Sequence, residues 1–356
     1  MDPLLLKTAI AVVPVIVLLL VFDRLDLHDV ITFREIGLLA LIGGTIAGFA
    51  LLANTRGLDG FPIGFSAWSR YVSPVIEETF KAAPIVGLFA INRLGYKLDS
   101  AIAGFAVGAG FSVIENAYFL YVLSDANMGA WLVRGFGTAI MHGGATALFA
   151  VVTHEFAEHQ AEANAESYSF KPWVFAPGLA IAIVAHSAFN HFPDTPVVAM
   201  ALTLLLAPMT LFFVFARSEL ATHRWLRTDR DRHLDVLKEM HAGRFAETIA
   251  GKTMADAARA AGLEAIDVLA HAKLGIELIL RAETLMLGEV RDASWGAEEA
   301  GRFAQFDALE RAIGPTGAAI SRRHAGVTRN DLWELGRLRV IVGRRERARK
   351  RRAART

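Results

Sequence analysis

The sequence has no cysteine among its 356 residues, which excludes disulfides, thiol catalysis and thiolate metal sites. It also lacks long apolar runs after Arg217, although 54% of the whole chain is hydrophobic. That fraction is too high for an ordinary soluble protein. Because long apolar runs are lacking after Arg217, the apolar residues are concentrated in the first part of the chain. Acids are almost missing from the end, where Glu346 is the only one between Gly343 and Thr356.

No small-x-small cleavage site follows the early apolar stretch Thr8–Phe22, which instead runs into Asp23-Arg24-Leu25-Asp26. A secretory signal peptide would need such a site. We therefore expect this stretch to be retained as a membrane anchor.

Seven segments before Arg217 approach the roughly 20 mainly apolar residues that a helix needs to cross a bilayer. These segments are Leu4–Phe22, Ile36–Ala53, Val72–Ile91, Ala101–Leu123, Ala130–Val152, Val174–Phe192 and Val197–Ala216. The sequence therefore predicts an all-α fold, in which residues 1–216 form a polytopic helical membrane bundle of about seven spans. Gly44 with Gly48, and Gly104 with Gly108, have the spacing that lets two helix backbones approach closely.

Residues 217–342 are predicted to form a cytoplasmic helical domain, because Ala, Leu, Glu and Arg dominate and apolar residues recur at helical spacing. Residues 343–356 are predicted to be a basic, disordered tail. The domain could recruit a cytoplasmic protein partner, and the tail could meet anionic lipid headgroups. No specific binding of nucleic acid is expected.

Basic residues after the last apolar segment fix the expected orientation in the cell membrane. Arg217, Arg224 and Arg227 stand there, and positive charge favours the cytoplasmic side. Counting back across seven spans places the amino terminus outside the cell and the carboxyl terminus in the cytoplasm.

Two adjacent acids and a lysine stand near the start of the third apolar segment. Glu77 and Glu78 lie four and three residues before Lys81, so a helix brings the lysine to the same side as both acids. An ion pair with one acid would leave the other free to move protons. The alternative is a charge cluster at a helix end, in the membrane interface.

Three further spans carry polar residues deep inside apolar sequence, where such residues are expensive and usually functional. They are Glu115 with Asn116, His142 with Thr146, and His186 with Asn190. Each histidine could instead be a hydrogen-bonded core residue. In the predicted topology, however, Glu77, Glu78, Glu115, His142 and His186 reach a similar depth in the outer half of the membrane. We therefore expect one shared site.

These motifs, in this order, resemble the PrsW family of intramembrane proteases, which is placed with the CAAX-type prenyl-protein endopeptidases. The similarity covers roughly Ile36–Ala216 and is most specific at the EETFK and FSVIEN motifs. Lys81 and Glu115 depart from the EExxxR and FxxxH patterns of the prenyl branch. The resemblance implies an endopeptidase that cuts a membrane-anchored protein, such as an anti-sigma factor, on the extracytoplasmic side.

Two mechanisms are open from the sequence. In the first, Glu78 or Glu77 activates water, Glu115 positions the water or protonates the leaving amine, and a histidine or Asn190 stabilises the oxyanion. In the second, zinc is held by His142, His186 and Glu78. No HExxH motif decides between them, and the metal-free version is slightly favoured.

Other classes of function remain open as well. Intramembrane acids and histidines also form the proton pathways of transporters. No inverted repeat of apolar segments, a common sign of a transporter, is found. A membrane scaffold without catalytic activity is the third alternative, and such a scaffold should tolerate loss of Glu77 or Glu78.

Overall fold

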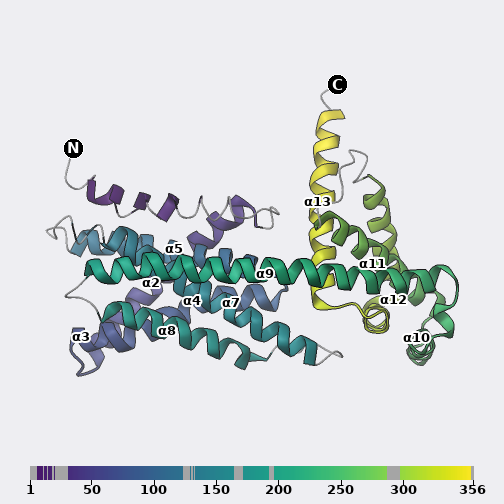
Figure 1. Ribbon diagram of the computed structural model, residues 1–356, viewed down its shortest axis with the longest axis horizontal. Helices are drawn as coiled ribbons and strands as arrows, with labels where there is room; N and C mark the ends of the chain where they lie inside the picture. Colours follow the sequence, from purple (N-terminus) through teal and green to yellow (C-terminus); the bar gives the residue numbers. More distant parts are fainter. Residues whose placement is uncertain are drawn as a thin grey trace. The chain divides into compact units, whose positions relative to one another are not determined.

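The computed structural model describes residues 31–122, 133–163, 171–191, 196–286 and 297–353, with residues 129, 131 and short pieces between 6 and 20. The chain forms two compact units, Met1–Ser218 and Glu219–Thr356. Within the described ranges every regular element is a helix, as the sequence predicts (Figure 1).

The first unit is built from helices of very different length. They are α2 (Phe33–Gly60), α3 (Phe65–Ala67), η1 (Trp68–Val72), α4 (Ser73–Ala90), α5 (Lys97–Val122), η2 (Val133–Thr138), α7 (Ala139–Ala163), η3 (Pro172–Phe175) and α8 (Ala176–Asn190). A long helix, α9 (Pro196–His241), begins in this unit. Helix α2 starts at a capping box, in which Thr32 and Glu35 satisfy each other's backbone N–H groups.

Helix α5 is the centre of the first unit and packs against α2 on one side and α7 on the other. Glycines permit both contacts. A Cβ atom on Gly104 or Gly108 would collide with the backbone of α7, and one on Gly110 would collide with α2. The predicted close approach is therefore present at Gly104 and Gly108, whereas nothing lies within 4 Å of such an atom on Gly48.

Four helices of the described chain are long and apolar enough to cross a membrane. They are Phe33–Gly60, Lys97–Val122, Val133–Ala157 and Pro172–Asn190, and they match four of the seven predicted spans. The predicted third span forms α4, which carries three charged residues, Glu77, Glu78 and Lys81, within its 18 residues. Much of the first predicted span lies outside the described residues.

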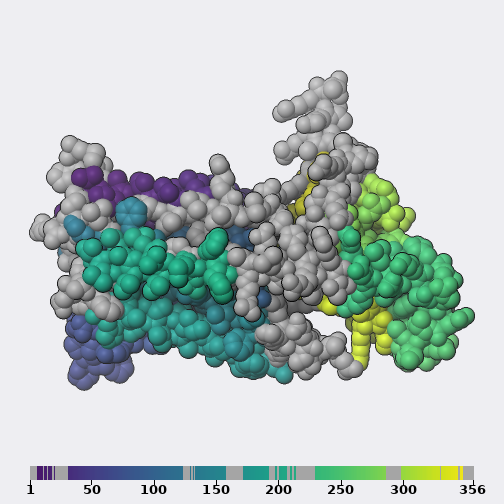
Figure 2. All heavy atoms as spheres, in the orientation of Figure 1, coloured from purple at the N-terminus to yellow at the C-terminus, as the bar shows by residue number. Residues whose placement is uncertain are grey.

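The seventh predicted span falls within α9. The described side chains of its first part leave many large apolar groups exposed, including Leu205, Met209 and Phe212. Figure 2 shows the described residues of this part at the molecular surface, in teal and green. An exposed apolar surface of this kind is typical of contact with a membrane or another protein.

The second unit contains the end of α9, η4 (Phe245–Glu247), α10 (Ile249–Ala260), α11 (Ala265–Met286), α12 (Ala297–His324) and α13 (Arg329–Ala353). Helix α11 packs against α10, α12 and α13. Residues such as Ile276 and Leu338 form the apolar core of this second unit. Helix α12 is kinked at Gly314, which has a positive φ of 65° and precedes Pro315.

The segment predicted as a disordered tail is helical as far as Ala353, since α13 continues through Gly343. Arg, Lys, Glu and Ala fill that segment, and all four are good helix formers. The prediction gave weight to the run of positive charge and overlooked the helix propensity of the residues that carry it.

His271 of α11 makes the stability of the second unit depend on pH. The buried imidazole hydrogen-bonds to Ser321 (Nδ1 to Oγ, 2.8 Å) and stacks on Phe306. Burial, with a smaller contribution from Arg322, lowers the pKa of His271 to about 4. The unfolded imidazole binds its proton near the ordinary value, about 6.5, so stability is complete above that pH and falls as the pH drops toward 4.

We therefore expect the wild-type second unit to lose about 1–3 kcal/mol between pH 6.5 and 4 relative to His271→Phe, which has no imidazole to protonate. Hydrogen exchange of α11 in the full-length protein measures this difference. Equal pH dependence in the two proteins would contradict the assignment.

Candidate functional site

The acidic motif of α4 is buried in the first unit rather than placed at an exposed helix end. Glu77, Glu78 and Lys81 are 6%, 2% and 0% exposed. The Lys81 ammonium pairs with Glu78 (Nζ to Oε1, 2.5 Å), so the lysine neutralises this acid and not Glu77. Such burial does not fit the alternative of an exposed charge cluster at a helix end in the membrane interface.

Hydrogen bonds hold the carboxylate of Glu77 at only one of its two oxygens. Its Oε1 accepts hydrogen bonds from the Ser73 hydroxyl (2.6 Å) and from the Asn54 amide (3.1 Å). Asn54 is itself held by the indole N–H of Trp68 (3.1 Å). The second oxygen, Oε2, is buried and has no hydrogen-bond partner in the described part of the chain. A buried, unpartnered carboxylate oxygen is costly, which favours a ligand or a reacting group at this atom.

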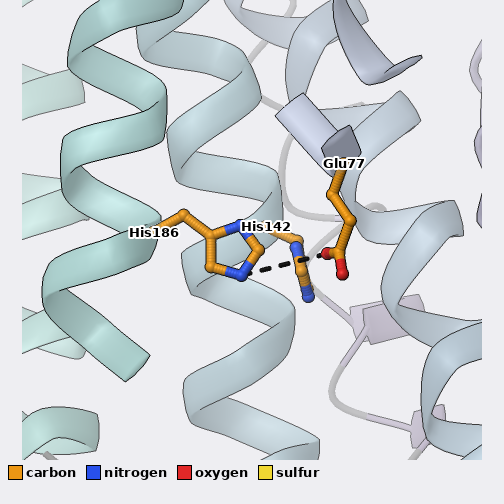
Figure 3. A group of neighbouring side chains, drawn as sticks. All are labelled: Glu77, His142 and His186. Atoms are coloured by element: carbon orange, nitrogen blue, oxygen red, sulfur yellow. Dashed lines mark ion pairs between the residues drawn. The ribbon is translucent and has the colours of Figure 1, made fainter. Parts of the chain in front are cut away.

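His186 of α8 faces that oxygen. Its Nδ1 lies 2.7 Å from Glu78 Oε1, and because an ionised carboxylate only accepts, Nδ1 carries the proton. Nε2 then presents a lone pair and lies 3.9 Å from Glu77 Oε2. The dashed line in Figure 3 marks this pair. A carboxylate that fixes the tautomer of a histidine is a frequent device at metal sites.

His142 of α7 links the two acidic clusters. Its Nδ1 lies 2.9 Å from Lys81 Nζ, and its Nε2 lies 2.8 Å from Glu115 Oε2. Since an ammonium group only donates, Nδ1 accepts and Nε2 donates to Glu115. The ring meets that of His186 edge to face, with centroids 4.9 Å apart. The predicted residues from four segments thus lie side by side.

The four predicted supporting residues have different positions. Lys81 lies inside the cluster, as described above. Thr146 donates to the carbonyl of His142 (2.9 Å), and Asn116 donates to that of Arg134 (3.3 Å). The Asn190 amide donates to the carbonyl of Ser69 (2.8 Å), which joins α8 to η1.

Three residues around the site were missed by the sequence reasoning. Ser73 stands one helical turn before Glu77, a spacing that could have been recognised. Arg134 lies 3.7 Å from Glu115 and over the ring of Phe119, and a lone arginine in an apolar segment was also a usable signal. Asn54 comes from another helix, and nothing in its local sequence indicates its contact with Glu77.

Glu77, His142 and His186 could together hold a metal ion, because one ligand atom from each lies within 4.8 Å of the others and all three side chains are buried. Two imidazoles and one carboxylate are a donor set found at catalytic zinc sites. Glu77 Oε2 and His186 Nε2 fit this role, while His142 must release Lys81 or Glu115 first. The carboxylate in this group is Glu77, in place of the predicted Glu78, because Glu78 is occupied by Lys81 and His186.

The comparison with protein families decides the affiliation. A model of the PrsW family of intramembrane metalloproteases matches residues 34–216, more than half of the chain. The chain belongs to the PrsW family. The searches of curated proteins and of solved structures gave no match.

PrsW membership makes this chain a membrane protease and weighs against the transporter alternative. The match includes every predicted site residue from Glu77 to Asn190 and ends at residue 216, two residues before the end of the first unit at Ser218. The second unit lies beyond the PrsW match and has its own core.

Proposed function

We propose that this PrsW-family chain is a metal-dependent intramembrane endopeptidase that hydrolyses a peptide bond of a membrane-anchored protein. The observation that carries the proposal is the unpartnered Oε2 of Glu77, which is buried and faces the lone pair of His186. In this proposal Glu77, His142 and His186 are the metal ligands. A divalent ion held there would activate a water molecule and polarise the scissile carbonyl.

The neighbouring residues prepare these ligands. Glu78 accepts a hydrogen bond from the Nδ1–H group of His186 and so directs Nε2 toward Glu77. Lys81 compensates the charge of Glu78 within an otherwise apolar helix. Ser73 and Asn54 hold one oxygen of Glu77, which fixes the direction of the other. Each of these contacts reduces the reorganisation that binding and reaction would require.

Glu115 is the remaining carboxylate of the cluster, and we assign it proton transfer. It is partly exposed and hydrogen-bonds to His142, with Arg134 near its other oxygen. In the proposed reaction Glu115 takes a proton from the attacking water and passes it to the leaving amine. Arg134, 3.7 Å from Glu115, compensates the negative charge that Glu115 carries before it takes the proton and after it has released it. The metal-free alternative gives the first of these steps to Glu77.

The proposed topology has seven spans, with α4 and the first part of α9 among them, the amino terminus outside and residues 217–356 in the cytoplasm. The basic residues after the seventh span support this orientation. The site then lies in the outer half of the membrane. We propose extracytoplasmic cleavage of a single-span protein of the anti-sigma-factor type.

The test compares membrane-anchored proteins in cells that carry the wild-type chain or Glu77→Gln. At least one such protein should be shortened only in wild-type cells, with the cut close to the outer membrane surface. Identical proteins in both cell types would contradict the protease proposal. Activity that survives complete chelation in purified wild-type protein would exclude the metal and leave the glutamate mechanism.

A further inference from the structure

A second group of buried acids and a histidine lies in the second unit, outside the PrsW match. Asp229 and His233 stand one helical turn apart on α9, Glu283 belongs to α11, and Asp331 lies in the first turn of α13. One ligand atom from each lies within 4.8 Å of the others. Asp229 is 6% exposed and the other three are fully buried.

In each of the three carboxylates, one oxygen makes contacts that hold the side chain in place. His233 Nδ1 lies 2.7 Å from Glu283 Oε1, and its Nε2 lies 3.5 Å from Asp331 Oδ2. The same Asp331 oxygen accepts the backbone N–H of Thr328 (2.6 Å) and so caps α13. Arg232, whose side chain is 46% exposed, pairs with Asp229 Oδ1 (2.5 Å).

Among the described residues, no N–H or O–H group donates a hydrogen bond to the other oxygen of each carboxylate. These atoms are Asp229 Oδ2, Glu283 Oε2 and Asp331 Oδ1, and all three are buried. Leaving a buried charged oxygen unsatisfied costs more than a typical hydrogen bond contributes. Three such atoms around one histidine therefore indicate a partner that no described side chain or backbone N–H supplies.

Positive charge reaches the group from two arginines. Arg232 pairs with Asp229 and lies 3.8 Å from Asp331 Oδ2, and Arg230 lies near Glu283. Without a metal, protons are shared within the group, between His233 and Glu283 and between Asp229 and Asp331. A divalent cation bound to the carboxylates would replace these protons.

We propose that Asp229, His233, Glu283 and Asp331 form a structural binding site for a divalent transition-metal ion. Carboxylates suit Mn²⁺ and imidazole suits Zn²⁺ or Fe²⁺, so a mixed set of three carboxylates and one imidazole fits this class of ion better than Ca²⁺ or Mg²⁺. Burial on all sides is typical of a structural site, whereas a catalytic site keeps a position open.

The ion would join three helices that are distant in sequence. Its ligands come from the end of α9, from α11 and from the start of α13, so binding would oppose separation of these helices. The site is independent of the proposed peptidase site, because none of its residues belongs to the matched family region.

The experiment uses the full-length protein in detergent, stripped with a chelator and dialysed against Mn²⁺ or Zn²⁺ alone. A Glu77→Gln, His186→Ala background removes the ligands proposed for the first unit. We expect this protein to retain one ion per chain by mass spectrometry of the metal, and Glu283→Gln or Asp331→Asn to lose it. Asp235→Asn, an exposed acid on the same helix, is the matched control and should retain the ion.

Two measurements separate binding from misfolding. The Mn²⁺ complex should show magnetic coupling to one histidine nitrogen, and His233→Gln should abolish this coupling. Mn²⁺ should also slow hydrogen exchange of α11 and α13 in the protein that keeps Asp229, His233, Glu283 and Asp331. If the double-mutant background binds no ion, or if Glu283→Gln and Asp331→Asn leave the bound ion in place, the proposal is wrong and a protonated His233 holds the group together.

Discussion

Replacing Glu77 with glutamine is expected to lower the rate of substrate cleavage by about 10³-fold or more. Glutamine keeps the length of the side chain and an acceptor for Ser73 and Asn54, so the helix should keep its place. The change removes the negative charge and the free oxygen that faces His186. Both a metal ligand and a general base require that oxygen as a carboxylate.

Cleavage of a defined substrate by purified wild-type and Glu77→Gln protein measures the effect, and the metal content of both proteins separates the two mechanisms. A ligand role predicts that the bound metal of the first unit is lost with activity. A role as base in a metal-free site predicts lost activity in the absence of any ion there. Activity within about 10-fold of wild type would reject both roles.

Glu78→Gln is a less direct test of chemistry, because Glu78 is part of the fold. It is the acid that pairs with buried Lys81, and it fixes the ring of His186. Breaking a buried pair by removing one partner destabilises by about 3–5 kcal/mol. Loss of activity in that variant would therefore mix misfolding with chemistry, whereas no lysine or arginine of the described residues forms a salt bridge with Glu77.

The composition of the site could be predicted from the sequence, but the internal pairing could not. Charged residues in apolar helices stand out because burial makes them costly, which identified Glu77, Glu78, Glu115, His142 and His186. Lys81 is near enough along the helix to reach either acid, so spacing left both pairs open. The choice of Glu78 depends on His142 and His186, which come from other helices.

The same limit applies to the fold. Long apolar runs predicted helices well because their length and composition are local properties. The close approach at Gly104 and Gly108 depends on the opposing backbone of α7, and Gly48 has the same spacing without any such neighbour. The buried group around His233 was also missed, because its residues stand in polar sequence, where acids are common and do not indicate a buried site.

Replacing Gly108 with alanine is expected to destabilise the first unit by about 3 kcal/mol or more, at the upper end of the usual cost of overpacking. An added Cβ atom would lie 2.1 Å from the carbonyl oxygen of His142 and 2.8 Å from the Cα atom of Gly143. Backbone cannot rotate away as a side chain can, so α5 and α7 must separate. The separation would also draw His142 away from Glu115, and cleavage should fall with stability.

Gly48→Ala is the matched control, because an added Cβ atom there meets nothing within 4 Å. In mid-helix this change should be neutral or stabilise by up to about 1 kcal/mol, since alanine favours helix. Thermal unfolding of the two variants in the same detergent, followed by hydrogen exchange of α5 and α7, measures the contrast. Equal stability of Gly108→Ala and Gly48→Ala would show that α5 and α7 are packed less closely than the glycine contact requires, and the position that α7 gives His142 would then need another cause.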